Sequence, residues 1–155
     1  MGAFLLSAHD AELAVRLIAA TFLGALVGLE RGIHGKDAGF KTYTLVCLGS
    51  ALMMVLSTEI FLIYKGVASV DPSRIAAQVV TGIGFLGAGA IIRSQQGSVR
   101  GLTTAAGIWT ICGIGMACGV GLYKIAVITT LLVLVILILF LKVEHHMIPK
   151  KNQGE

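Results

Sequence analysis

Residues 82–87 form a G-x-G-x-x-G motif, the glycine spacing with which dinucleotide-binding folds approach a pyrophosphate. Such a site also needs a preceding strand and an acidic residue about twenty positions further on. Here Gly107 occupies that position, and no Asp or Glu occurs between Asp71 and Glu144. We therefore interpret the glycines as part of an apolar span, where glycine lets helices approach closely or lets a helix break around a site.

Ionisable side chains inside apolar spans are costly, and each one is a functional candidate. Glu30 ends the first apolar span, and Glu59 lies late in the second. Arg16, early in the first span, and Gln78, one turn into the third, fall at the depth of Glu59. The sequence predicts a polar group of these last three residues, with Arg16 paired to Glu59. The alternative is that Arg16 extends to the membrane surface and Glu59 is interfacial.

A denser polar group is expected at the opposite face, where the first span ends and the second and fourth begin. Helix N-termini carry free N–H groups and a partial positive charge, so two of them beside basic residues favour an anionic group. That group is either Glu30 itself or a lipid phosphate, and the alternative is a salt-bridged interface. The predicted members are Glu30, Arg31, Lys41, Thr42, Arg93, Arg100, Thr103 and Thr104.

The elements that must position these residues are membrane helices. The chain has 155 residues, of which 56% are hydrophobic and 13% charged, with a mean hydropathy of +0.90. These values predict an all-α polytopic membrane protein, since a helix needs about 20 apolar residues to cross a bilayer. A turn at residues 121–124 must divide the last long apolar stretch. The five predicted transmembrane helices span residues 13–29, 42–64, 75–92, 102–122 and 125–141.

The distribution of basic residues predicts the orientation. Of the 12 lysines and arginines, eight lie on the side that holds residues 31–41, 93–100 and 142–151. Because cytoplasmic loops carry the excess of Lys and Arg, that side is predicted to be cytoplasmic. Residues 1–12 then form a short external segment, residues 13–141 the five-helix domain, and residues 142–155 a short charged cytoplasmic tail.

Small residues recur at four-residue spacing in several spans, as in G-x-x-x-G contact faces. They serve contacts within the monomer or in a homodimer, or they line an ion path; the sequence leaves these alternatives open. The glycines singled out are Gly24, Gly28, Gly82, Gly84, Gly87 and Gly89.

Other chemistries find little support in the sequence. Cys47, Cys112 and Cys118 lie in apolar segments without a C-x-x-C motif, so free buried thiols are expected, with a soft-metal path as the alternative. Two carboxylates are too few for an all-protein Mg²⁺ site in one subunit. The basic residues fall between apolar runs, so nucleic acid is not expected as a partner. No catalytic triad stands out. We expect that the protein binds no cofactor and is not an enzyme.

Four blocks of the sequence resemble the MgtC/SapB family of bacterial inner-membrane proteins. They read LGALVGLER at residues 23–31, DAGFKTYTLV at 37–46, VTGIGFLGAGAI at 80–91 and VRGLTTAA at 99–106. The resemblance covers about residues 13–125. The family pattern usually reads A-G-L-R-T-H where this chain has Ala38-Gly39-Phe40-Lys41-Thr42-Tyr43. Lys41 therefore replaces a bidentate arginine with a point charge.

The resemblance implies a multi-pass protein of the bacterial inner membrane. Several members carry a C-terminal cytosolic domain, and this chain resembles the short form without it. The family is linked to adaptation to low magnesium, and some members resemble regulators of the F-type ATP synthase. We expect a non-enzymatic protein that acts through contacts with a partner membrane protein, and we expect a homodimer. The alternative is a small transporter of Mg²⁺ or another cation with a path along the Gly-rich third span.

Overall fold

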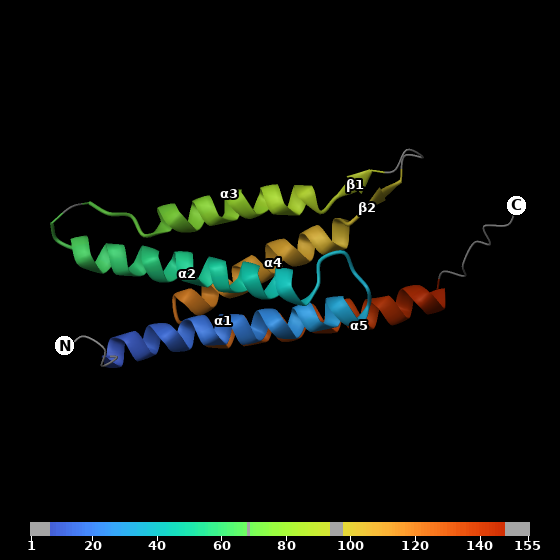
Figure 1. The fold of residues 1–155 in the computed structure, drawn as a ribbon, viewed down its shortest axis with the longest axis horizontal. Coiled ribbons are helices and arrows are strands. Elements are labelled where there is room, and N and C mark those ends of the chain that lie inside the picture. The colour runs from blue at the N-terminus through green and yellow to red at the C-terminus, as the bar shows by residue number, and fades with distance from the viewer. Residues whose placement is uncertain (1–6, 68, 94–97, 148–155) are drawn as a thin grey trace, which may run out of the picture.

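The computed structural model describes residues 7–67, 69–93 and 98–147, and the side chains of residues 92–93 and 140–147 are outside the description. Within these residues the chain is helical, apart from a short hairpin of β1 (Ile92–Arg93) and β2 (Val99–Arg100). This confirms the predicted all-α fold with five helices (Figure 1). The helices are α1 (Ala8–Ile33), α2 (Phe40–Tyr64), α3 (Ser73–Gly89), α4 (Leu102–Gly119) and α5 (Tyr123–Met147).

The ends of the helices follow local sequence signals. Before α1, the Ser7 hydroxyl accepts a hydrogen bond from the Asp10 N–H at 3.1 Å, and the Asp10 carboxylate accepts one from the Ser7 N–H at 2.9 Å. This capping box satisfies N–H groups that have no partner inside the helix. Gly101 precedes α4 with φ of +87°, and a side chain there would collide with the Ala90 carbonyl. Gly121, with φ of +84°, makes the turn predicted between the last two spans.

The core lies between α1, α2 and α4, which pack closely against one another. Glycines make this approach possible. A Cβ atom on Gly24 would lie 2.6 Å from Cys47 Cβ of α2, and one on Gly28 would lie 2.9 Å from the Phe40 backbone. A Cβ on Gly119 of α4 would lie 2.5 Å from the Ala51 carbonyl of α2. The small-residue faces predicted on the first and fourth spans are therefore contacts within the monomer.

Helix α3 lies at one edge of the bundle, against α4 and α2 (Figure 1). It is one continuous helix from Ser73 to Gly89, so the glycine-rich segment does not break it. Only Ile83 and Gly87 of this helix are buried. Nothing lies within 4 Å of the place where a side chain would begin on Gly82, Gly84 or Gly89. These three glycines do not pack against the rest of the monomer, in contrast to those of α1 and α4.

Helix α5 packs on α4 and α1, and most of its described side chains are exposed. It continues to Met147, so residues 142–147 of the predicted tail are helical. Residues 148–155 and the first six residues of the predicted external segment lie outside the described part of the chain. Among the described residues, α1, α2 and α4 are long and apolar enough to cross a membrane, and the described apolar part of α5, Tyr123–Leu139, is shorter.

Candidate functional site

Glu30 and Arg31 form a buried ion pair at the C-terminal end of α1. Their exposed fractions are 7% and 2%, and Arg31 Nη1 lies 3.5 Å from Glu30 Oε2. His34 closes the pair toward the surface, with its Nδ1 atom 3.1 Å from Glu30 Oε1 and 2.9 Å from the Glu30 carbonyl oxygen. Charges taken out of water in this way are costly unless they are paired and hydrogen-bonded.

The pairing of Glu30 is incomplete. Within the described residues, neither of its carboxylate oxygens has a hydrogen-bond partner, and the same holds for Arg31 Nε. Buried polar groups are satisfied in the great majority of cases, so each exception needs an explanation. Glu30 thus has Arg31 and His34 at salt-bridge distance but no hydrogen bond to either carboxylate oxygen, and Arg31 Nε has no acceptor among the described residues.

Tyr43 connects this pair to the rest of the bundle. Its side chain is fully buried beside Arg31, and its hydroxyl donates a hydrogen bond to the Thr104 carbonyl oxygen at 3.3 Å. A side chain on Gly107 would collide with the Tyr43 hydroxyl. Tyr43 thus joins the start of α2 to the first turns of α4 at the end of α1. The sequence did not lead us to select Tyr43 or Gly107 as site residues. The signal that could have identified Tyr43 is its position in the family pattern, where it replaces the usual histidine.

The structure divides the predicted polar cluster at this end of the bundle into two sets. Glu30, Arg31 and Thr104 are buried. A second set is exposed at the surface and forms no salt bridge in the described part of the chain. The side chain of Arg93 lies outside the described residues. The exposed members of the cluster are Lys41, Thr42, Arg100 and Thr103.

At the opposite end, which we call the Arg16 end, the structure corrects the predicted pair of Arg16 and Glu59. Arg16 forms a salt bridge with Glu12 and donates a hydrogen bond to the Gly119 carbonyl oxygen at 3.0 Å. Glu59 Oε2 instead lies 3.0 Å from His9 Nε2. The C-terminal end of α4 presents carbonyl groups without helical partners and a partial negative charge, which attract the guanidinium. Gln78, the third expected member, is exposed.

Two cavities lie along the seam between α2 and α3. The first, of about 410 Å³, is at the Glu30 end, and Asp37, Thr42 and Gly89 contribute to its lining. The second, of about 320 Å³, lies deeper along the same seam and is lined mainly by apolar side chains, Met53 and Ile83 among them. The seam is hollow because α3 packs mainly on α4.

Metal ligands do not gather in the described part of the chain. No group of three or more His, Cys, Asp or Glu side chains there could hold a metal ion. Cys47, Cys112 and Cys118 are free thiols buried in the core, as expected.

A bundle of apolar helices with a buried ion pair at one end defines a polytopic helical membrane protein. The chain belongs to the MgtC family, whose family model matches residues 17–146. This confirms the resemblance found in the four sequence blocks.

Curated relatives share the same region. A protein from Escherichia coli strain K12 named "Putative magnesium transporter YhiD" is 42% identical over 132 residues, which cover 84% of this chain and 61% of the relative. "Protein SapB" of Bacillus subtilis is 35% identical over 81% of this chain and 55% of its own length. "Protein MgtC" of Salmonella typhimurium strain LT2 is 42% identical over 77% of this chain and 48% of its own length. The chain thus spans about half to three-fifths of these relatives, and no solved structure matches it.

Proposed function

We propose that this protein is a non-enzymatic protein of the bacterial inner membrane that serves adaptation to low magnesium by contacting another membrane protein. The observation that carries the proposal is the open face of α3. Gly82 and Gly89, seven residues apart, lie on one side of this helix and Gly84 on another, and no part of the described monomer fills the room beside them. In lipid, small residues allow the close helix contacts that drive association. An unbroken helix with such a face favours a partner helix over an ion path.

The buried ion pair fits the same proposal. Arg31 is 2% exposed, and Tyr43 covers it between α2 and α4. An arginine sealed in this way opposes the passage of a cation along α1 by electrostatic repulsion. In this reading, Glu30 and Arg31 hold the end of the bundle together and do not line a path.

Cation transport is the second candidate, and one specific observation favours it. Glu30 carries two buried carboxylate oxygens without a hydrogen-bond partner in the described residues. A hard cation such as Mg²⁺ prefers oxygen ligands of this kind. The E. coli relative is also named as a putative magnesium transporter.

Flux measurements separate the two candidates. The purified protein is reconstituted in liposomes that contain a Mg²⁺-sensitive dye, with Glu30→Gln as the test variant and Lys41→Gln, exposed at the same end, as the control. The contact proposal expects no flux above protein-free liposomes for either variant or the wild type. Uptake by the wild type and the control that disappears in Glu30→Gln would establish the transport candidate instead.

Site-specific photo-crosslinking tests the contact directly. A photoreactive residue replaces Phe85, which is 83% exposed on α3, or Ile128, which is 54% exposed on α5. The proposal expects a discrete adduct in cells from position 85 and none from position 128. The adduct's mass distinguishes a second copy of this chain from another protein, and antibodies against membrane subunits of the F-type ATP synthase test that partner. Equal labelling at both positions would contradict a specific α3 contact.

A further inference from the structure

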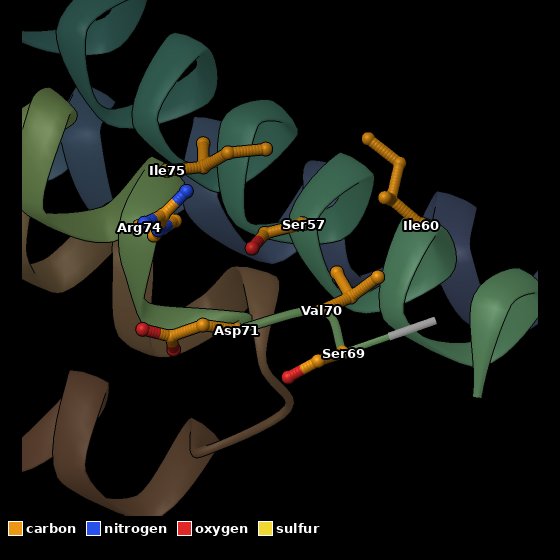
Figure 2. Close-up of a pocket in the computed structure, with 7 residues that line it drawn as sticks. All are labelled: Ser57, Ile60, Ser69, Val70, Asp71, Arg74 and Ile75. Carbon is orange, nitrogen blue, oxygen red and sulfur yellow. The ribbon is translucent and has the colours of Figure 1, made fainter. Parts of the chain in front are cut away.

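A third cavity, of about 470 Å³, lies at the Arg16 end of the bundle, where the chain turns from α2 into α3 (Figure 2). Ser57 and Ile60 of α2 form one wall, and Asp71, Arg74 and Ile75 form the other. The turn between two membrane helices lies at the level of the lipid headgroups. The volume of the cavity falls in the range of about 300–1,000 Å³ that small-molecule sites occupy. The function proposed above does not use this cavity.

The cavity carries one positive and one negative group that attract each other but form no salt bridge within the described residues. Arg74 is exposed and forms no salt bridge within the described residues. Asp71 Oδ1 accepts hydrogen bonds from the Ser73 N–H at 2.8 Å and the Ser73 hydroxyl at 2.6 Å, and Oδ2 takes neither of them. A guanidinium favours a phosphate, and a carboxylate oxygen favours an ammonium donor. Together they suit a ligand that carries both.

The wall that bears these charges is held in place. The Ser57 hydroxyl, 2% exposed, donates a hydrogen bond to the Pro72 carbonyl oxygen at 2.6 Å, which ties the turn to α2. Asp71 in turn accepts a hydrogen bond from the first N–H group of α3, that of Ser73. The two charged groups therefore project from a turn with a defined backbone, and the site is formed before a ligand arrives.

An apolar groove begins about one helical turn further along the α2–α3 seam, toward the middle of the bundle. It is the cavity of about 320 Å³ along the α2–α3 seam, with Gly49 and Met53 of α2 on one side and Val79 and Ile83 of α3 on the other. Ile75 lies one helical turn before Val79 on the same helix, so the polar pocket and the groove follow one seam. A charged pocket at headgroup level above an apolar groove matches a phospholipid with its acyl chain.

We infer that this pocket binds a zwitterionic phospholipid with a primary ammonium, of the phosphatidylethanolamine type. Its phosphate faces Arg74, its ammonium faces Asp71, and one acyl chain occupies the groove. Phosphatidylglycerol offers no cation to Asp71. Phosphatidylcholine carries a quaternary ammonium, which has no N–H to donate to the carboxylate. The phosphate is common to the three lipids, so Arg74 contributes affinity for each of them and Asp71 discriminates among the headgroups.

Native mass spectrometry of the purified full chain tests this assignment, with the three lipids carrying identical acyl chains. The wild type is expected to retain phosphatidylethanolamine about fivefold better than the other two, the ratio expected for one partly exposed ion pair. Arg74→Gln should weaken the retention of all three lipids, because each of them carries the phosphate. Asp71→Asn, which keeps a capping side chain at the start of α3, should shift the preference toward phosphatidylglycerol. Lys65→Gln, exposed at the same end of α2, is the matched control and should behave as wild type.

Two results would overturn the inference. Equal retention of the three lipids by the wild type would show that the pocket does not read the headgroup. An unchanged preference in Asp71→Asn, or undiminished retention of all three lipids in Arg74→Gln, would place the recognition elsewhere. Far-UV circular dichroism verifies that each variant remains helical, and Asp71→Asn keeps the test decisive if Arg74→Gln unfolds. Soluble phosphoethanolamine is tested as a ligand in the same experiment. Binding of it as tight as that of the lipid would identify a soluble zwitterionic phosphate as the ligand.

Discussion

The buried pair at the end of α1 permits a quantitative test through the variant Arg31→Met. Arg31 and Glu30 are 2% and 7% exposed, and their charged atoms lie 3.5 Å apart. Removing one member of a buried pair costs about 3–5 kcal/mol, because the other charge stays buried without compensation. In Arg31→Met, His34 Nδ1 still lies 3.1 Å from Glu30 Oε1, which limits this penalty. We expect Arg31→Met to lower the free energy of unfolding by about 3 kcal/mol.

The partner variant should be the more damaging one. Glu30→Gln leaves a guanidinium that cannot lose its proton, so we expect a loss of about 4 kcal/mol. The double variant removes both charges and should lie within about 1 kcal/mol of the wild type, since a buried pair often contributes little over apolar side chains. The two single changes are therefore strongly non-additive.

Reversible unfolding in mixed detergent micelles, followed by far-UV circular dichroism during SDS titration, measures these free energies. Lys41→Gln, exposed at the same end of the bundle, serves as the control for a change of surface charge. Our reasoning would be refuted if Arg31→Met were as stable as this control. It would also fail if the double variant lost the sum of the two single losses, because the charges would then act independently.

Three further predictions follow from other contacts. Gly24→Ala should destabilise the bundle by about 1–3 kcal/mol, because its Cβ would lie 2.6 Å from a side-chain carbon of α2. Gly84→Ala, with open space around it, should be neutral or stabilising by up to about 1 kcal/mol. Equal effects of the two variants in SDS titration would contradict this packing. A double-mutant cycle of Arg16→Leu and Glu59→Leu should be additive within about 0.5 kcal/mol, since each charge has another partner; a larger coupling energy would restore the predicted pair. Hydrogen bonds from Ser73, the first residue of α3, hold the pKa of Asp71 below its usual range. The stabilising contribution of Asp71 is therefore present above the ordinary pKa of an aspartate and is lost as the pH falls through the lowered pKa. Asp71→Asn should remove this loss of stability in acid, which is measured as the midpoint of thermal unfolding against pH.

Much of the fold was predictable from sequence because its signals are local. Apolar runs of bilayer length predict helices without reference to their neighbours. Gly121, between the last two runs, predicts the turn that joins α4 to α5. The four-residue spacing of Gly24 and Gly28 predicts a contact face, and the structure shows that α2 occupies it.

The candidate site was predictable only in part. The sequence selected Glu30, Arg31 and Thr104, and the structure buries all three at one end of the bundle. The sequence also predicted a pair of Arg16 and Glu59, because the position of a residue in an apolar span indicates only its depth in the membrane. Partners at equal depth are decided by how the helices are arranged around the bundle axis, and that arrangement turns Arg16 toward the end of α4.

The sequence by itself determined that this chain is a helical membrane protein of the MgtC family, because length, hydropathy and motif blocks are properties of the chain alone. The tertiary structure decided what each glycine and each charge does. Gly24 and Gly28 of α1 and Gly119 of α4 allow α2 to approach, whereas Gly82, Gly84 and Gly89 of α3 face open space. The physical reason is that a missing side chain only creates room, and the packing of the whole bundle determines whether another helix fills that room.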